Sequence, residues 1–320
     1  MARVLVTARL PGHSTQRLAV DHDLTYRDVD APMPRDELLG SVSGVDAVVA
    51  VLVDRVDAEL LDAAGSQLRV VANVAVGYDN VDLAACAERG VVVTNTPGVL
   101  TDATADLAMA LVLMTTRGLG AAERRVRTGE PWDWSLTAHL GTSLRGRTLG
   151  IVGPGAIGLA TARRAKAFGM EILLAGRSDP DPRAVEGLGA LVVGLAEVLE
   201  ASDVVSLHCP LTAETRHLIA ADELRAMKPT AHLVNTSRGP VVDEEALVVA
   251  LESGEIAGAG LDVYEEEPRV HPGLLQRDDV VLLPHVGSAT LETRSAMAGL
   301  AVDNVLAVLS GEAPLTPVRY

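Results

Sequence analysis

The chain has 320 residues and a mass of 33.4 kDa, and at roughly 150 residues per domain this length predicts two domains, each able to bury its own core. It carries 43 acidic and 27 basic side chains, a net charge of −16, which repels a nucleic-acid backbone and argues against nucleic acid as a partner. Two cysteines without a CxxC pair, and no apolar run near the ~20 residues that span a bilayer, predict no disulfide framework, no bound metal and no membrane span. We therefore expect a cytoplasmic protein.

Short β-rich runs alternate with helical segments along the whole chain, which is typical of parallel sheets covered by helices. In the first part, strands are predicted at residues 3–7, 46–52, 68–74 and 91–95. Helices with apolar residues at helical spacing are predicted between the last three of these strands, at 57–65 and 80–90. These elements predict a small doubly wound unit in roughly the first 95 residues.

A long apolar helix is predicted at 101–119, and an irregular stretch follows it up to residue 147. A second series of strands is then predicted at 148–153, 171–176, 190–193, 203–209, 232–237, 257–263 and 280–285. Seven strands with intervening helices predict a complete dinucleotide-binding sheet. The last segment, from residue 291, predicts one amphipathic helix that we expect to return to the first domain.

A GxGxxG motif follows the first strand of this second series and directly precedes a predicted helix. In this context the first glycine permits a tight turn, the second lets the backbone approach a pyrophosphate, and the third packs the helix on the strand. The motif therefore predicts a dinucleotide site that consists of Gly153, Gly155, Ala156, Ile157 and Gly158. The structural alternative is an ordinary strand-to-helix turn.

The end of the second strand in this series bears on the type of cofactor. An acidic residue ~20 positions after the glycines normally holds the ribose hydroxyls of NAD. This strand instead ends in Arg177 and Ser178, a guanidinium and a hydroxyl that suit a 2′-phosphate. We therefore predict a preference for NADP(H), with NAD(H) as the alternative if Asp179 or Asp181 holds the ribose.

Three polar segments follow late strands of the second series, at 235–239, 262–268 and 284–290. In open α/β sheets these strand ends form the ligand crevice. Together with the motifs at 73–80, 95–98 and 208–212, they resemble the D-isomer-specific 2-hydroxyacid dehydrogenase family over essentially the whole chain. The loop AVGYDN, the segment TDATADLA and the Gly-Arg-Ser strand end are most similar to the glyoxylate and hydroxypyruvate reductase branch.

The resemblance implies an α/β fold of two doubly wound domains, Rossmann-like and flavodoxin-like, with parallel sheets and a cleft between them. Residues 1–98 with 291–320 would form the substrate-binding domain, and 99–290 the dinucleotide-binding domain. The implied reaction is NAD(P)H-dependent reduction of a small 2-oxo acid, glyoxylate or hydroxypyruvate, to the D-2-hydroxy acid. His285 would donate the proton, Glu267 would orient His285, and Arg238 would bind the substrate and polarise its carbonyl group.

The other implied site residues divide between substrate and cofactor. The substrate carboxylate is assigned to the amides of Val76 and Gly77, and the substrate's side group to Leu52. On the cofactor side the resemblance adds Thr104, Cys209, Pro210, Thr215, Thr236, Asp262 and Gly287. It also implies a homodimer formed through residues 101–147, whereas a buried intramolecular helix at 101–119 is the structural alternative.

Two kinds of alternative remain open. Within the family, phosphoglycerate dehydrogenases usually show an Arg-rich approach to the AVG loop, where this chain has Asn73, and D-lactate dehydrogenases carry an Arg near the same loop. Outside enzymes, the corepressors called C-terminal binding proteins share this fold and cofactor and act by recruiting partners. The lack of an extended disordered tail or partner-docking segment favours a metabolic enzyme.

Overall fold

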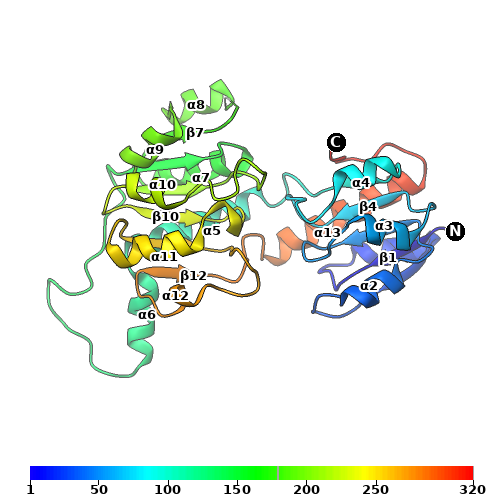
Figure 1. The fold of residues 1–320 in the computed structure, drawn as a ribbon, viewed down its shortest axis with the longest axis horizontal. Coiled ribbons are helices and arrows are strands. Elements are labelled where there is room, and N and C mark those ends of the chain that lie inside the picture. The colour runs from blue at the N-terminus through cyan, green and yellow to red at the C-terminus, as the bar shows by residue number, and fades with distance from the viewer. Residues whose placement is uncertain (179, 320) are drawn as a thin grey trace. The chain divides into compact units, whose positions relative to one another are not determined.

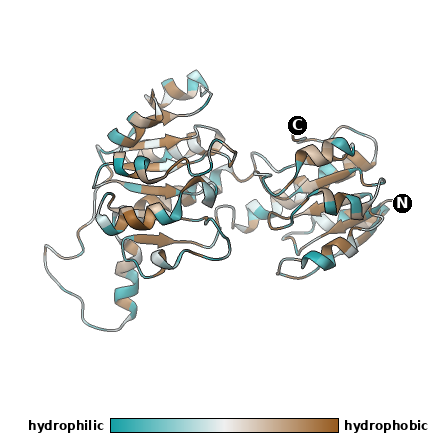
Figure 2. Ribbon diagram, viewed as in Figure 1, coloured by the Kyte–Doolittle hydropathy of each residue, from teal (hydrophilic) through white to brown (hydrophobic). Residues whose placement is uncertain are grey.

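The computed structural model describes residues 1–178 and 180–319, and its chain divides into two compact units. Unit 1 comprises Met1–Leu100 with Ser288–Tyr320, and unit 2 comprises Thr101–Gly287. Each unit has its own parallel sheet with helices packed on it (Figure 1). Apolar residues concentrate on the strands of both sheets (Figure 2). The predicted α/β class with two parallel sheets is therefore confirmed.

Unit 1 contains a five-stranded parallel sheet in the order β2-β1-β3-β4-β5. Its strands are β1 (Arg3–Val6), β2 (Asp23–Tyr26), β3 (Ala47–Ala50), β4 (Val70–Asn73) and β5 (Val92–Thr94). The inner strands β3 and β4 are buried along their whole length, which explains why they appear in the sequence as continuous apolar runs. The strand β2 was not predicted, because this edge strand alternates exposed and half-buried residues and has no apolar run.

Helices cover both faces of the unit 1 sheet. On one face, α13 (Leu291–Leu309) packs through a stripe of buried alanine and valine side chains, beside η1 (Ser14–Arg17) and α1 (Leu18–Asp21). On the other face lie α2 (Arg35–Ser41), α3 (Ala58–Ala64) and α4 (Leu83–Glu88). After α13 the chain pairs with β5, where the Val318 amide donates to the Val93 carbonyl at 2.8 Å. The C-terminal helix and tail thus complete unit 1.

Unit 2 contains a seven-stranded parallel sheet in the order β12-β11-β10-β9-β6-β7-β8. Its strands are β6 (Thr148–Val152), β7 (Glu171–Ala175), β8 (Leu191–Val192), β9 (Val204–Leu207), β10 (His232–Asn235), β11 (Gly258–Leu261) and β12 (Val280–Leu282). All seven predicted strands are present, and each ends earlier than predicted. The residues assigned to strand ends therefore lie in loops just beyond the sheet, where their polar groups are not part of the strand ladder.

Two sets of helices sandwich this second sheet. On one face α5 (Thr101–Thr116) and α7 (Ala156–Ala167) pack against each other and on the sheet, with α8 (Pro182–Leu188) beside α7. On the other face lie α9 (Leu195–Ala201), α10 (Ala221–Ala226), α11 (Glu244–Ser253) and α12 (Pro272–Leu275). The predicted helix 101–119 ends at Thr116 and is buried in the core of unit 2 along one side.

A second helix, α6 (Leu119–Arg127), follows α5 after a bend of 70°. It has no buried residues, and with the loop after it α6 extends from the body of unit 2 (Figure 1). In the part of the chain that the structure describes, no single helix is long and apolar enough to cross a membrane. Among the described residues, the bent pair of α5 and α6 meets that length and composition when the two helices are taken together.

Both strand orders contain a point where the order of the strands reverses, between β1 and β3 in unit 1 and between β6 and β9 in unit 2. Ligands of open α/β sheets bind outside the carboxyl ends of the strands near such points. We therefore expect ligands at the loops that follow β3 and β4 in unit 1, and at those that follow β6, β9, β10, β11 and β12 in unit 2.

Candidate active site

The glycine loop joins β6 to α7, and its three glycines differ in the space that surrounds them. Gly153 has a φ of +90°, and a Cβ there would lie 2.6 Å from the Cys209 nitrogen. A Cβ on Gly158 would lie 2.5 Å from the Gly153 carbonyl oxygen, whereas one on Gly155 would meet nothing within 4 Å. Gly153 and Gly158 thus serve close packing. Gly155 leaves open space beside the first turn of α7, the place where a helix N-terminus accepts a diphosphate.

A second observation supports a ligand at this edge of unit 2. The Thr236 hydroxyl, just past the end of β10, is buried and has no hydrogen-bond partner among the described residues. Buried hydroxyls without a partner are uncommon in native structures and point to a missing ligand or water. Together with the open space at Gly155, this orphaned hydroxyl makes the loops beyond β6 and β10 fit a dinucleotide.

The remaining cofactor residues of the sequence prediction lie in loops of unit 2. Thr104, in the first turn of α5, lies close to Gly287, where an added Cβ would meet the Thr104 methyl group at 3.4 Å. Cys209 is buried and Pro210 is exposed in the loop after β9. Thr215 closes that loop, because its hydroxyl donates to the Pro210 carbonyl at 2.6 Å.

The end of β7 carries the two residues that were predicted to select NADP(H). Arg177 and Ser178 are both exposed, and Arg177 Nη1 lies 3.9 Å from Glu214 Oε2. Asp181 instead caps α8, accepting the Arg183 amide at 3.0 Å, so its carboxylate is already engaged. Asp179 lies outside the described residues.

The three predicted catalytic residues follow β10, β11 and β12, which are neighbours in the sheet. His285 Nδ1 lies 2.8 Å from Glu267 Oε2. Arg238 is half-buried in the loop after β10, and its charge acts on Glu267. Partial burial raises the pKa of Glu267, but the hydrogen bond and charge of His285, the Tyr264 amide and Arg238 outweigh burial and lower it below its ordinary value. The structure thus brings Glu267 and His285 together as a hydrogen-bonded pair.

Asp262 holds the two residues that directly follow His285 in the chain. Its two carboxylate oxygens accept the amides of Val286 and Gly287, each at 2.8 Å. Burial raises the pKa of Asp262. The hydrogen bonds from the Val286 and Gly287 amides and the charge of His285 oppose that increase. His285 itself has a φ of +54°, a conformation that only a well-held backbone imposes on a residue with a side chain.

Tyr264, for which the sequence predicted no role, links the loops around the catalytic residues. Its amide donates to Glu267 Oε1 at 3.0 Å, and its hydroxyl donates to the Leu283 carbonyl at 2.8 Å, two residues before His285. A Cβ on Gly239 would lie 1.8 Å from the Tyr264 carbonyl carbon, so the residue next to Arg238 also packs on it. The position of Tyr264 inside the acidic motif was the only signal in the sequence.

The predicted substrate residues belong to unit 1. Leu52 is half-buried in the turn after β3, which Asp54 closes by accepting the Val51 amide at 2.8 Å. Val76 and Gly77 lie in the loop after β4, and their amides have no acceptor among the described residues. Two adjacent free amides form the kind of concave donor pair that binds a carboxylate.

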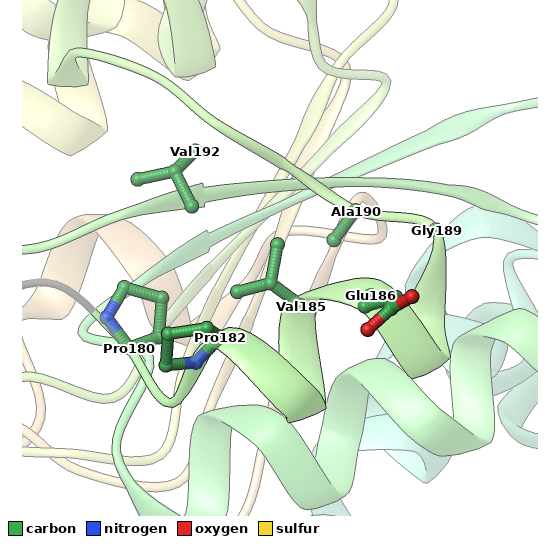
Figure 3. Close-up of a pocket in the computed structure, with 7 residues that line it drawn as sticks. All are labelled: Pro180, Pro182, Val185, Glu186, Gly189, Ala190 and Val192. Carbon is green, nitrogen blue, oxygen red and sulfur yellow. The ribbon is translucent and has the colours of Figure 1, made fainter.

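Two other features carry no catalytic chemistry. Within residues 1–178 and 180–319, no three or more His, Cys, Asp or Glu side chains are placed to hold a metal ion. A surface depression of about 460 Å³ lies beside α8 and β8 (Figure 3). Its lining is apolar except for one carboxylate, and consists of Pro180, Pro182, Val185, Glu186, Gly189, Ala190 and Val192.

Comparison with known proteins decides the family. Residues 109–287 match the model of the D-isomer specific 2-hydroxyacid dehydrogenase NAD binding domain. The chain belongs to the D-isomer specific 2-hydroxyacid dehydrogenase family. It is an NAD(P)-dependent 2-hydroxyacid dehydrogenase, as the motifs predicted.

Relatives match this dehydrogenase over nearly its whole length. It is 48% identical to the glyoxylate reductase of Thermococcus litoralis over 318 residues, which cover 98% of this chain and 95% of the relative. A crystal structure of a Thermus thermophilus protein is 45% identical, with a TM-score of 0.92 over 99% of this chain and all of the other. The NADPH-dependent glyoxylate/hydroxypyruvate reductase of Sinorhizobium meliloti, solved with NADP and malonate, is 40% identical with a TM-score of 0.84, over 99% and 96% of the two chains.

Proposed function

We propose that this dehydrogenase reduces a short 2-oxo acid, glyoxylate or hydroxypyruvate, to the D-2-hydroxy acid. The observation that carries the proposal is the His285–Glu267 couple at 2.8 Å, in which a carboxylate holds one ring nitrogen and leaves the other for a proton transfer. The first relatives found, at 46% to 49% identity over almost the full chain, are all named glyoxylate reductase. Their name supports a substrate with a very small side group.

In this proposal the chain's residues bind the substrate and move one proton. The amides of Val76 and Gly77 donate to the substrate carboxylate, and Leu52 contacts its side group. Arg238 donates hydrogen bonds to the substrate and polarises its carbonyl bond. His285 gives its proton to the carbonyl oxygen, while Glu267 stabilises the imidazolium form before the transfer. The nicotinamide supplies the hydride to the carbonyl carbon.

We also propose that NADP(H) is the preferred cofactor. The support is the absence of an acidic residue directly at the end of β7, together with the exposed guanidinium of Arg177 and the hydroxyl of Ser178. Both groups suit a 2′-phosphate. The Sinorhizobium meliloti relative is named as NADPH-dependent.

The proposed assembly is a homodimer formed through α6 and residues 128–147. This segment exposes both tryptophans of the chain, with 50% of Trp132 and 89% of Trp134 accessible, and Leu136 is 98% exposed. Apolar side chains exposed together mark interaction surfaces. Sedimentation velocity is expected to give twice the monomer mass. A Trp132→Ala/Trp134→Ala variant that stays dimeric, or a monomeric wild type, would overturn the assembly.

The test of the function is a panel of 2-oxo acids of increasing side-group size, assayed with NADPH and with NADH. Glyoxylate and hydroxypyruvate with NADPH are expected to give the highest kcat/KM, and the product is expected to be the D isomer wherever the product is chiral. Pyruvate, which lacks the hydroxyl of hydroxypyruvate, and 2-oxo acids with side groups larger than that of hydroxypyruvate are expected to give lower kcat/KM. No turnover of any member of the panel with either cofactor would overturn the proposal.

A further inference from the structure

The loop after β4 is framed by three asparagines, Asn73, Asn80 and Asn95, to which the proposed function gives no role. Asn73 is the last residue of β4 and is fully buried. Asn80 ends the loop and Asn95 follows β5, both half-buried. The side-chain amides of Asn73 and Asn95 face the loop that carries Val76 and Gly77.

Two of these amides hold the carbonyl groups of that loop. Asn95 Nδ2 donates to the Val76 carbonyl at 2.8 Å. Asn73 Nδ2 donates to the Gly77 carbonyl at 3.0 Å. A carbonyl oxygen only accepts, so the amide nitrogen rather than the amide oxygen of each asparagine must face it.

Asn80, at the end of the loop, holds the side chain of Asn73 in place. Asn80 and Asn73 exchange reciprocal side-chain hydrogen bonds, at 3.1 and 3.2 Å. The second Nδ2 hydrogen of Asn80 donates to the Asp54 carbonyl at 2.9 Å. These bonds tie the loop after β4 to the turn after β3, so that Asn73 has a single fixed orientation.

The hydrogen bond from Asn95 fixes the direction of the Gly77 amide. In a trans peptide the C=O and N–H groups point in opposite directions, and the Val76 carbonyl shares its peptide with the Gly77 amide. The preceding peptide is held likewise, because the Thr96 amide donates to the Ala75 carbonyl at 2.8 Å, which directs the Val76 amide. Glycine has wide backbone freedom, so without the Asn95 hydrogen bond the peptide between Val76 and Gly77 could rotate. The Gly77 amide would then no longer point toward the substrate carboxylate.

We propose that Asn95 is a positioning residue for the substrate carboxylate, which acts by directing the Gly77 amide, and that Asn73 holds the other side of the same glycine. The inference rests on the proposed function, because the carboxylate is that of the 2-oxo acid. It assigns a role to asparagines of the motifs 73–80 and 95–98, which in the sequence served only as signs of the family.

The Asn95 side chain can be removed without breaking the C-terminal pairing. The Asn95 amide donates to the Thr316 carbonyl at 3.3 Å, and the Asn95 carbonyl accepts the Thr316 hydroxyl at 2.6 Å. Both bonds use main-chain atoms of Asn95. Asn304, buried in α13, in turn holds Thr316. An Asn95→Ala variant is therefore expected to fold.

The test compares Asn95→Ala with Gln67→Ala. Gln67 is a matched control, because its side-chain amide also donates to main-chain carbonyls of unit 1, those of Ala64 and Val45, away from this loop. Loss of a hydrogen bond to a charged group is expected to raise the KM for glyoxylate and the inhibition constant of oxamate, a non-reducible analogue, at least about tenfold. The KM for NADPH should stay unchanged, and kcat should fall by less than about threefold.

Several outcomes would overturn the inference. Unchanged KM and oxamate inhibition in Asn95→Ala would do so, and so would an equal effect in Gln67→Ala. Asn73→Ala gives an independent second variant with the same expected split between KM and kcat. Hydrogen exchange on the wild type with NADPH completes the test: oxamate must slow exchange in the peptides that cover residues 74–80. A wild type that reduces no 2-oxo acid would overturn the proposed function, whereas an active wild type with a normal Asn95→Ala variant would overturn this inference alone.

Discussion

Glu267 binds His285 with one carboxylate oxygen, Oε2 to Nδ1 at 2.8 Å, and binds the Tyr264 amide with the other, Oε1 at 3.0 Å. Both oxygens are therefore fixed, and the carboxylate cannot rotate away from the ring. Nε2 of His285 makes no hydrogen bond within the described residues, so it is the nitrogen that can face a substrate. This division of the two ring nitrogens underlies the first two predictions.

Glu267→Gln is expected to lower kcat by roughly 10- to 100-fold. The amide still accepts from Nδ1 but lacks the charge that stabilises the imidazolium, so the pH above which reduction slows is expected to move down. A pH profile of kcat/KM for glyoxylate reduction measures both effects. Glu266→Gln, at the exposed neighbouring acid that pairs with Arg269, is the control and should retain the wild-type profile. An unchanged Glu267→Gln profile would remove Glu267 from this role.

His285→Ala is expected to abolish turnover, because it removes the proposed donor of the proton to the carbonyl oxygen. Affinity for NADPH should stay within about twofold of the wild type, since the predicted cofactor contacts are made by residues other than His285. Steady-state assays and a fluorescence titration of NADPH measure the two quantities. A variant with a near-normal rate would exclude His285 as the donor.

The sequence identified residues by their place after strands, and this worked because parallel strands end at one edge of a sheet. Arg238, Glu267 and His285 follow three neighbouring strands, and Glu267 and His285 do form a couple. Six of the seven predicted strands of unit 2 are mostly buried, and buried strands are continuous apolar runs in the sequence. The seventh, β8, is an exposed edge strand that still has an apolar sequence.

The sequence was uninformative where a role depends on three-dimensional contact or on an exposed edge. Tyr264 acts through its amide and hydroxyl on residues 3 and 19 positions away, and nothing in its neighbourhood signals those partners. The strand β2 exposes alternate residues at the sheet edge, so it lacks the apolar run that marked the others. The asparagine contacts to loop carbonyls depend on loop conformation, which spacing does not determine.

Arg177→Ala is expected to raise the KM for NADPH by about tenfold or more and to leave that for NADH nearly unchanged, because a guanidinium bonds a 2′-phosphate strongly and a ribose hydroxyl weakly. The comparison of both cofactors in one assay isolates the phosphate contribution. Arg183→Ala, an exposed arginine on the nearby α8, is the control for a general loss of positive charge. Equal losses for both cofactors would show that Arg177 does not hold the phosphate.

Gly239→Ala is expected to destabilise unit 2 by about 3 kcal/mol or more and to reduce activity strongly. A Cβ at this position would lie 1.8 Å from the Tyr264 carbonyl carbon, so the backbone beside Arg238 or the acidic loop must move. Gly187→Ala in α8 meets no heavy atom within 4 Å and should stabilise by about 0.5–1 kcal/mol through the unfolded state. Urea titration measures the free energy of unfolding of both variants. Equal changes in the two variants would contradict the prediction.

His208 predicts a specific pH dependence of stability. Burial lowers its pKa from 6.5 to about 4, while Nε2 stays bonded to the Ser206 hydroxyl at 2.9 Å. Between these pH values the unfolded chain binds a proton that the folded chain does not, so stability is complete above about pH 6.5 and falls as the pH drops toward 4.

His208→Asn should remove this part of the pH dependence. Relative to pH 7, the wild type is expected to lose about 1–2 kcal/mol more than the variant by pH 5. Urea unfolding at several pH values measures the difference, and groups common to both proteins, including buried His232, cancel in it. His139→Asn, at an exposed histidine of the loop after α6, is the control and should follow the wild type. Parallel curves for wild type and His208→Asn would mean that His208 is protonated equally in the folded and unfolded chains.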